Sequence, residues 1–448
     1  MRRSTSCVTS ILRRLWLDRR GAIAVTVGLL TPVLIGMTGF VIDIGHVMYV
    51  QRQLQASSDA AALAGARELN CCATSIAVST ATAYSAAWTS SSVTGANKNA
   101  DSNLYVQMVS GYPKLMCFAS TGVSCTGPDG NNGIVVRETA TVSMWFAQIL
   151  GISSIPVTTT STAGGTGGSA SPYDVDIVLD TTASMQNNDP NCGMSKIACA
   201  SAGVEAFLKQ VSPSADYVGL LAFPGLSSTT QQSKDYTCGG GTPVTTAYKN
   251  VPTTTTAGKP TYQVLGLQHD YKASATSTTL NTSSALVVAT GGGGCQGMQA
   301  PGGFGTFYAD AITAAQNDLT VNGRSGVPKV IMLLSDGDAN ATSANMPSAK
   351  LKQQCHEAIA AAHAATAAGY VVMTIGYAAP MSGCSTDVSP TISPCATLQQ
   401  MASAPVDFYS DQGAGCASTM QSLTSLIAIF GKIGGSFTAP RLLPDNTT

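Results

Sequence analysis

The chain has 448 residues, a formal net charge of −1 at pH 7 and 13 cysteines. Only 10% of its residues are charged, against about 25% in an average soluble protein. The length allows two or three domains with a sizeable core. A nucleic-acid partner is disfavoured because no basic stripe follows the N-terminus.

The N-terminal segment predicts a membrane anchor. Residues 1–20 form a basic tail with six arginines and a single acid, Asp18. Gly21 to Ile42 is a run of 22 residues without a charge, and about 20 apolar residues are enough to cross a bilayer as a helix. The positive-inside rule keeps the tail in the cytoplasm and sends the chain after Ile42 across the membrane. The alternative is a cleaved signal peptide, whose apolar region is usually only about 7–15 residues long.

The apolar pattern continues beyond the membrane. Val47, Val50, Leu54 and Ala61 fall at offsets of 0, 3, 7 and 14, which predicts one helix running to about Leu69. Asp43 lies at the membrane edge, where pairing with a partner helix and simple interfacial solvation are both open.

The glycine, aspartate and alanine positions of residues 17–67 resemble the N-terminal module of TadG-like proteins. These are components of the tight-adherence (Flp) pilus-assembly systems of bacteria. The resemblance implies a single-pass protein of the inner (cytoplasmic) membrane, with its N-terminus in the cytoplasm and its C-terminal domain in the periplasm. It also implies that other pilus-assembly components are its partners.

Residues 71–163 predict a small α+β region like the one that follows the anchor in TadE- and TadG-like proteins. Its predicted elements are strands at 104–109, 134–142 and 155–160 and a short helix at 145–151. A Gly/Ser/Thr-rich linker at 164–172 separates this region from the rest, because it has too little apolar content to pack.

Cysteine usage suits an oxidising compartment. Cys7 precedes the anchor, which leaves 12 cysteines, an even number, beyond the membrane. Cys71 and Cys72 are adjacent and are expected to bond to distant partners. The pairs suggested by proximity, or by a shared insertion, are Cys192/Cys199, Cys384/Cys395 and Cys238/Cys295. A zinc site is disfavoured because no Cys-x₂₋₄-Cys pair occurs.

Residues 173–435 alternate strands with helices. Strands are expected at 177–179, 217–223, 330–334 and 371–376, and helices at 195–211, 306–319, 351–368 and 417–430. Continuous apolar strands between helices predict an α/β domain with a doubly wound, Rossmann-like parallel sheet. Residues 224–303, rich in Thr, Ser and Gly, are interpreted as an insertion near the ligand face with no place in the core.

Three segments of this domain follow strands or precede helices, where ligands bind in such sheets. They are Asp180–Met185, Gly305–Ile312 and Ser335–Asp338. In this order they resemble the metal-ion-dependent adhesion site of von Willebrand factor type A (vWA) domains, with Thr182 in place of the first serine. The resemblance implies a site for Mg²⁺, or Mn²⁺ or Ca²⁺, whose oxygen ligands are Asp180, Thr182, Ser184, Thr306 and Asp336. An acidic side chain of a partner would complete the shell.

No catalytic signature accompanies this site. Gly292, Gly294 and Gly297 satisfy the spacing of a dinucleotide fingerprint and follow a possible strand at 285–289. However, Pro301 and two glycines come next instead of a helix. The sequence therefore predicts a non-enzymatic, membrane-anchored component of Flp pilus assembly that binds partner proteins. The alternative is a membrane-anchored vWA adhesin or receptor that does not take part in pilus assembly.

Overall fold

The computed structural model describes residues 20–69, 74–87, 105–118, 131–165, 172–223, 236–238, 242–243, 249–250, 262–274, 277–300, 305–341, 352–419 and 423–443. The predicted basic tail up to residue 19, Cys71, Cys72 and most of the linker lie outside these ranges. Contacts divide the chain into two compact units. The first comprises Met1–Ala61, Thr82–Tyr112 and Val136–Ser161, and the second Ala62–Ala81, Pro113–Val135 and Thr162–Thr448.

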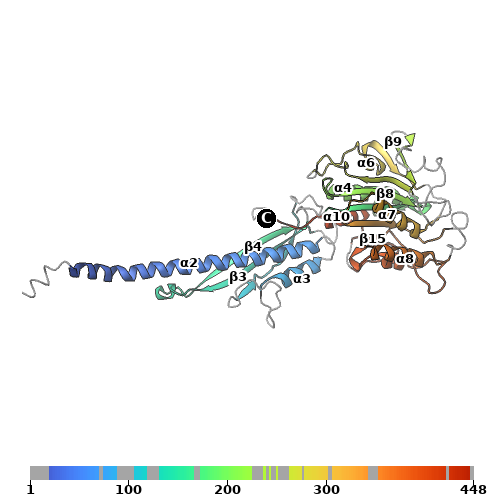
Figure 1. Cartoon of the computed structure of the whole chain (residues 1–448). Coiled ribbons are helices and arrows are strands. Elements are labelled where there is room, and N and C mark those ends of the chain that lie inside the picture. Colours follow the sequence, from blue (N-terminus) through green and yellow to red (C-terminus); the bar gives the residue numbers. More distant parts are fainter. Residues whose placement is uncertain are drawn as a thin grey trace, which may run out of the picture. The chain divides into compact units, whose positions relative to one another are not determined.

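A single helix, α2 (Arg20–Glu68), contains both the predicted anchor and its continuation. Pro32 lies inside it without ending it. The apolar side chains of its N-terminal half are exposed, and the helix is long and apolar enough to cross a membrane. Further along, Val50 and Leu54 are buried against Val106 and Val142. The predicted helix from Gly21 to about Leu69 is thus confirmed (Figure 1).

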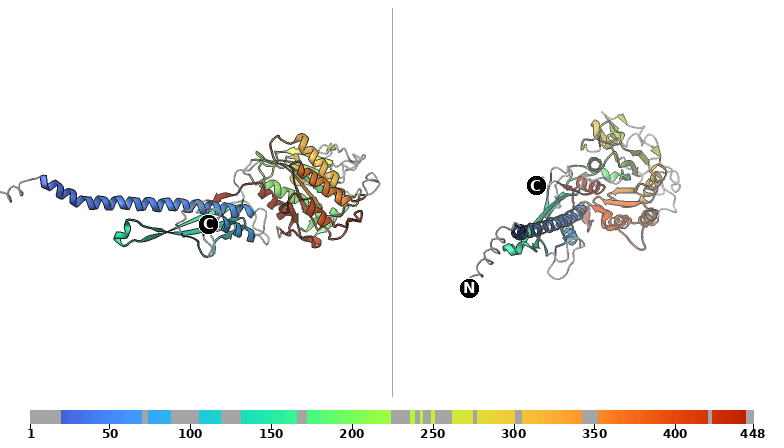
Figure 2. Two further views of the ribbon diagram at one scale, coloured as in Figure 1. Left: turned by 60° about the horizontal axis from the view of Figure 1, so that its bottom comes forward. Right: turned by 60° about the vertical axis from the view of Figure 1, so that its left-hand side comes forward.

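A small sheet has the strand order β1-β3-β4-β17, and β2 also pairs with β3. Its long strands β3 and β4 are neighbours and form a hairpin that lies beside α2 (Figures 1 and 2). The last strand comes from the C-terminal end of the chain and pairs antiparallel with the end of β4. The bounds are β1 (Val106–Met108), β2 (Lys114–Met116), β3 (Gly133–Ser143), β4 (Ser154–Gly164) and β17 (Arg441–Leu443), with helices α3 (Thr74–Tyr84) and η2 (Ala147–Leu150).

The second unit is built on a seven-stranded sheet of order β11-β12-β8-β5-β14-β15-β16. The five strands from β8 to β16 are parallel, and β12 and β11 extend one edge antiparallel. The bounds are β5 (Asp174–Asp180), β8 (Tyr217–Phe223), β11 (Lys249–Asn250), β12 (Tyr262–Gln268), β14 (Lys329–Ser335), β15 (Val371–Gly376) and β16 (Phe408–Ser410). The predicted α/β fold of vWA type is confirmed, with an antiparallel edge that the sequence did not suggest.

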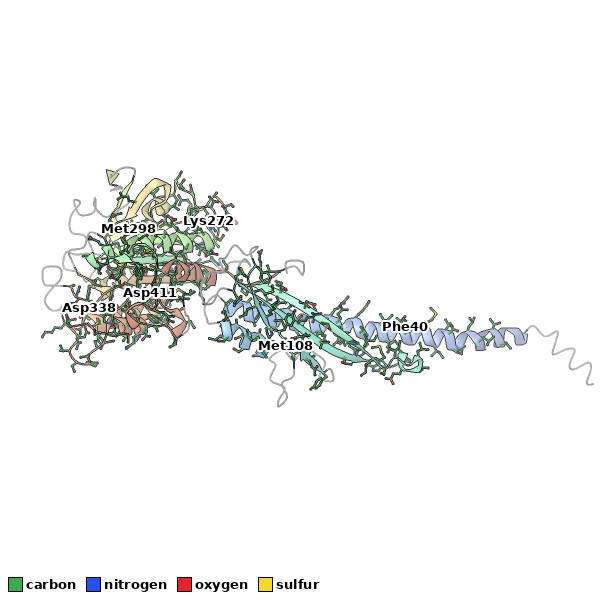
Figure 3. The ribbon with its side chains drawn as sticks, turned by 180° about the vertical axis from the view of Figure 1, so that it is seen from behind. Phe40, Met108, Lys272, Met298, Asp338 and Asp411 are labelled. Carbon is green, nitrogen blue, oxygen red and sulfur yellow. A yellow bond between two sulfur atoms is a disulfide. The ribbon has the colours of Figure 1, made fainter. Side chains whose placement is uncertain are left out.

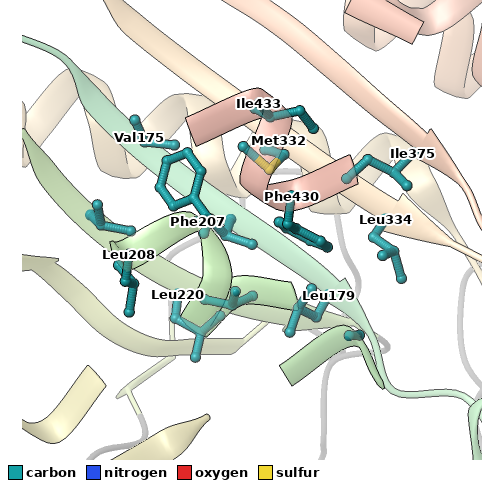
Figure 4. Close-up of a cluster of buried hydrophobic side chains, with 14 of the residues drawn as sticks. Val175, Leu179, Phe207, Leu208, Leu220, Met332, Leu334, Ile375, Phe430 and Ile433 are labelled. Atoms are coloured by element: carbon teal, nitrogen blue, oxygen red, sulfur yellow. The ribbon is translucent and has the colours of Figure 1, made fainter. Parts of the chain in front are cut away.

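Helices cover both faces of this sheet. Alternate residues of β5 explain why: Val175, Ile177 and Leu179 pack against α4 and α10 on one face, while Val178 faces α7 and α8 on the other. Figure 4 shows the first of these clusters, in which Phe207 and Phe430 fill the space above the strands. The bounds are α4 (Lys196–Gln210), α6 (Ala285–Ala289), α7 (Tyr308–Asn322), α8 (Gln354–Ala367), α9 (Pro394–Met401) and α10 (Leu426–Ser436).

Shorter elements complete the second unit. They are a three-stranded sheet of β10 (Thr242–Pro243), β9 (Tyr236–Cys238) and β13 (Cys295–Met298), a two-stranded ladder of β6 (Asn188–Asp189) and β7 (Met194–Ser195), and the 3₁₀ turns η3 (Ala183–Gln186), η5 (Gly292–Gly294), η7 (Pro405–Asp407) and η8 (Gly413–Gly415).

Two sequence expectations for this unit are wrong. Residues 224–303 are not wholly outside the core, because β12 joins the main sheet and Val264, Tyr271 and Leu286 are buried in it. Residues 285–289, read as a possible strand, form the helix α6. A run of five apolar residues fits a buried strand and a buried helical turn equally well.

The disulfides agree only in part with the predicted pairs. Cys192–Cys199 is present as expected. The predicted pair of Cys384 with Cys395 is wrong: the bonds are Cys355–Cys384 and Cys395–Cys416. The fold brings the start of α8 to residue 384, so proximity in sequence was the wrong guide. Cys295 is also disulfide-bonded and lies opposite Cys238 in the ladder of β13 and β9, but the expected bond between them falls outside the described side chains.

Candidate metal site

The candidate site lies at the carboxyl ends of two neighbouring parallel strands. Asp180 is the last residue of β5, and Asp336 directly follows β14. The register pairs Leu179 with Leu334, so the two acids leave the sheet next to each other. Both side chains are almost completely buried.

Hydroxyl groups connect these acids. The Ser184 hydroxyl donates to Asp336 Oδ1 at 2.7 Å and lies 3.0 Å from the hydroxyl of Thr182. The backbone N–H of Thr182 donates to Asp180 Oδ1 at 2.8 Å. Four of the five predicted ligands therefore form one continuous group of hard oxygen donors, which is the ligand type that Mg²⁺ prefers.

Thr306, the fifth predicted ligand, bonds through its backbone to the segment that follows Asp336. Its N–H donates to Asn340 Oδ1 at 3.2 Å, and its carbonyl accepts the N–H of Asn340 at 3.0 Å. These contacts hold the start of α7 against the chain that follows Asp336. The Thr306 side chain is buried, but none of the contacts described for it joins its hydroxyl to the other four residues.

Two residues outside the predicted ligand set, Ser335 and Tyr308, hold the acids and the loop after β14 in place. Ser335 donates to Asp180 Oδ2 at 2.6 Å and lies 3.3 Å from the Tyr308 hydroxyl. Tyr308 in turn donates to the carbonyl of Gly337. Ser335 was visible as part of the Ser-Asp-Gly motif, whereas nothing in the sequence marked Tyr308 as more than a helical apolar residue.

A positive charge is already present at the site. Lys196, the first residue of α4, places its Nζ 2.6 Å from Asp336 Oδ2. The same ammonium lies 5.6 Å from the centre of the Tyr377 ring. No spacing in the sequence linked Lys196 to the motif segments. This oxygen of Asp336 is therefore already paired with a cationic side chain.

The electrostatics also suit a cation. Burial, and then the nearby carboxylate of Asp336, raise the pKa of Asp180 to about 7, although hydrogen bonds from Ser335 and Thr182 oppose this. A divalent ion beside Asp180 would favour the charged form of this carboxyl group. The donor set therefore fits Mg²⁺ or a similar hard ion.

Other acids near the site have different roles. Asp338, labelled in Figure 3, accepts the N–H of Cys384 at 2.7 Å and so supports a disulfide loop. Asp189 and Asp338 each lie close to two cysteine sulfurs. Those sulfurs belong to the bonds Cys192–Cys199 and Cys355–Cys384, so neither group can offer the thiolates that a soft metal needs.

Family models match the N-terminal part of the chain. Residues 21–68 match Tad, the Flp pilus-assembly TadE/G-like family, and residues 64–163 match Tad_C, the Tad-like Flp pilus-assembly family. The N-terminal part of the chain is thus similar to Tad-like Flp pilus-assembly proteins. This confirms the resemblance read from the glycine, aspartate and alanine positions of α2. No curated protein sequence matches this chain.

Several solved structures are similar to this chain at low identity. The pilus adhesin SpaC from Lactobacillus rhamnosus GG is 13% identical, with a TM-score of 0.39, over 70% of this chain and 34% of its own. The vWF domain of the type V pili tip protein Mfa5 from Porphyromonas gingivalis is 14% identical, with a TM-score of 0.35, over 60% of this chain and 95% of its own. Proximal thread matrix protein 1 from the mussel byssus, with a zinc-occupied MIDAS motif, is 15% identical, with a TM-score of 0.32, over 61% of this chain and 48% of its own. The chain spans only about a third of the length of SpaC, and scores this low decide nothing about function.

Proposed function

We propose that this chain is a non-enzymatic, membrane-anchored component of tight-adherence (Flp) pilus assembly. Its vWA domain would bind a partner protein through a divalent cation. The observation that carries this proposal is the combination of Tad-like residues 21–163 with a group of oxygen ligands at the carboxyl edge of the α/β sheet.

In this proposal Asp180, Thr182, Ser184, Thr306 and Asp336 hold Mg²⁺, or Mn²⁺ or Ca²⁺. The ion would supply a point of attachment for an acidic side chain of the partner, because hard divalent cations favour carboxylate oxygens. The chain's own residues orient the site: Ser335 fixes Asp180, and Ser184 bridges towards Asp336.

The membrane arrangement follows from α2. Apolar residues 21–42 cross the inner membrane, the basic tail stays in the cytoplasm, and the vWA domain lies in the periplasm. The disulfides of the second unit support an oxidising compartment for that domain. Recovery of the full-length chain in the soluble periplasm would rule out the retained anchor.

Metal binding is tested by thermal unfolding of the full chain in detergent micelles. Ions at 100 times their dissociation constant stabilise by about 2.7 kcal/mol, which is about 5–10 °C for a domain of this size. Ser184→Ala removes one hydroxyl from the centre of the site and should abolish most of the shift. Ser212→Ala is the matched control, since that hydroxyl contacts Ser214 beyond the end of α4. Equal unfolding temperatures with Mg²⁺, with Mn²⁺ and with chelator would show that the motif binds no metal.

The pilus role is tested in the organism. Deletion of the gene should remove surface pili and adherence, and the Ser184→Ala chain should fail to restore them. The second candidate, a vWA adhesin unrelated to pilus building, predicts normal pili in the deletion strain and loss of attachment to one surface ligand. The same metal site serves both candidates, so only the Tad-like segment favours the first.

A further inference from the structure

The turn between β3 and β4 exposes large apolar side chains. We define residues 144–152 as the hairpin tip; its sequence, Met-Trp-Phe-Ala-Gln-Ile-Leu-Gly-Ile, contains no charge. Trp145 is 59% exposed, Ile149 87%, Leu150 77% and Ile152 44%. Four large apolar side chains gathered in nine residues are more than the scattered surface residues of a soluble domain, and such a patch marks an interaction site.

Asp43 of α2 attaches the hairpin tip to the helix. Its carboxylate accepts the backbone N–H groups of Trp145, Phe146 and Ala147, at 2.9, 2.9 and 2.6 Å. The Trp145 ring stacks on His46 with 4.6 Å between the ring centres. This carboxylate is therefore bonded to the chain's own hairpin tip, an arrangement that neither of the two alternatives left open by the sequence described.

The point of attachment lies at the end of the apolar run. Phe146 covers Gly39: a Cβ on that glycine would lie 2.6 Å from the Phe146 ring. Gly39 is three residues before Ile42, the last residue of the run, and so about 5 Å inside it at the rise of an α-helix. The hairpin tip thus lies beside the last turn of the segment proposed to cross the bilayer (Figure 2).

The exposed surface of α2 continues that of the hairpin tip. Phe40, labelled in Figure 3, is 52% exposed, and Val41 is 68% exposed. A bilayer covers such side chains on the helix, and the adjoining side chains of the hairpin tip lie at the depth where aromatic residues prefer to stay, close to the headgroups. Continuity with the proposed membrane segment therefore indicates lipid as the occupant.

Most backbone N–H groups of the hairpin tip are hydrogen-bonded within the protein. This suits an apolar environment, where an unpaired N–H or C=O is costly. The N–H of Met144 donates to Ser153, that of Ile149 to Phe146, and that of Ile152 to Ala147. Asp43 binds three more N–H groups, and Gly151 donates to Gln148. Seven of the nine residues therefore have an identified internal partner for their N–H group.

We propose that the hairpin tip inserts into the headgroup region of the bilayer that α2 crosses, in the leaflet on the side of the C-terminal domain. This inference depends on the proposed membrane anchoring. It adds a second, shallow membrane contact that fixes the small sheet at the bilayer surface. Asp43 is the positioning residue for this contact.

Trp145 is a built-in probe of the insertion, because the chain has only two other tryptophans, Trp16 and Trp88. The full chain and its Trp145→Phe variant are reconstituted in phosphatidylethanolamine–phosphatidylglycerol vesicles, and the difference between their spectra isolates Trp145. We expect blue-shifted emission that is largely lost when the lipids carry bromine near the headgroup end of their chains. Aqueous iodide should have little effect on this emission.

Charged side chains in the hairpin tip should prevent insertion, and with it the blue shift of Trp145 emission and its protection from iodide. Ile149→Asp with Leu150→Asp should return Trp145 emission to the red and restore iodide quenching. Val321→Asp with Val388→Asp is the matched control, since these valines are 80% and 78% exposed in the second unit, and it should change nothing.

Vesicle flotation distinguishes failure of the proposed membrane anchor from failure of the proposed insertion of the hairpin tip. Failure of the native chain to float would overturn the anchor and the insertion together. A floating chain whose Trp145 is quenched by iodide and not by brominated lipid would overturn the insertion alone. Shielding of Trp145 that disappears when the protein is diluted in lipid would assign the patch to a second copy of the chain, and would equally overturn it.

Discussion

Asp43 in the first unit and Asp336 in the second are both nearly inaccessible to water, yet their surroundings differ. Asp43 is only 2% exposed and binds three backbone N–H groups of one neighbouring turn. Asp336 is 4% exposed and binds one hydroxyl and one flexible ammonium. Backbone donors cannot move away, whereas Lys196 can rotate out. The first arrangement joins two elements of the fold; in the second, the proposed divalent ion would take the place of the Lys196 ammonium.

The two units also differ in how far their large apolar side chains are buried. The second unit buries its large side chains between a sheet and two helix layers. The first unit leaves many of them exposed along α2 and at the hairpin tip. An exposed apolar surface of this extent marks an interaction site, whereas the buried Asp336 carboxylate already has a partner for each of its oxygens. The partners proposed for the two units differ accordingly: lipid for the first and a divalent cation for the second.

The largest expected effect tests the permanence of the Asp43 connection. Asp43→Ala leaves three N–H groups of residues 145–147 without an acceptor, which is costly where water is excluded. Hydrogen exchange by mass spectrometry should show these amides losing about a hundredfold or more of their protection. Asp43→Asn keeps one acceptor oxygen and should lose less. Unchanged protection in both variants would mean that the contacts of the Trp145 and Phe146 rings with α2 are enough to hold the hairpin tip.

The next effect concerns Asp176, a third buried acid, for which no donor exists among the described residues. Burial, and then the charge of Asp318, raise its pKa well above the usual range. A folded-state pKa raised in this way contributes stability that is complete below the unfolded value, about 3.9, and is lost as pH rises through the folded value. Asp176→Asn should therefore stabilise the protein by about 1–3 kcal/mol at pH 7.

The same substitution should change little at pH 4, where both states of the native protein approach protonation. Urea unfolding at the two pH values measures the difference. A double-mutant cycle with Asp318→Asn should show that the effects of the two substitutions on the free energy of unfolding are not additive, because the two neighbouring carboxyl groups repel each other. A stabilisation that is equal at both pH values would show that charge is not the cause.

The smallest expected effect tests whether the Lys196 ammonium competes with Mg²⁺ for the Asp336 carboxylate. Lys196→Met removes the ammonium that lies against Asp336 and should tighten Mg²⁺ binding by about tenfold, since an ion no longer competes with a tethered charge. Titration calorimetry measures this directly. Lys209→Met changes an exposed lysine at the other end of α4 and should leave the affinity unchanged. Weaker binding in Lys196→Met would show instead that this lysine positions the carboxylate.

Long patterns in the sequence predicted the main elements. The 22 uncharged residues and the helical offsets of Val50 and Leu54 were enough for α2. Apolar runs of six or seven residues predicted β8 and β15 with their observed bounds. The strand-end motif predicted the neighbours Asp180, Ser184 and Asp336, because parallel strands bring their carboxyl ends to one edge.

Short or distant features were not predictable in the same way. The three-residue strand β16 and the eight-residue helix α9 have too few positions for a period to appear. The closing helix was expected at 417–430, but α10 begins only at Leu426. Lys196 reaches Asp336 across 140 residues of sequence, and only the packing of α4 on the sheet brings them together.

Strand β17 has a consequence for the order of assembly. Residues Arg441–Leu443 pair with Thr162–Gly164 of β4, immediately before the chain enters the α/β domain. The whole α/β domain is therefore inserted in the sequence between two strands, β4 and β17, that are hydrogen-bonded to each other. During synthesis the edge of the small sheet stays open until the last strand emerges, so the sheet can be completed only after the entire domain has been made. A chain that ends prematurely would present β4 as an unpaired edge, which is the kind of edge on which strands from other chains add.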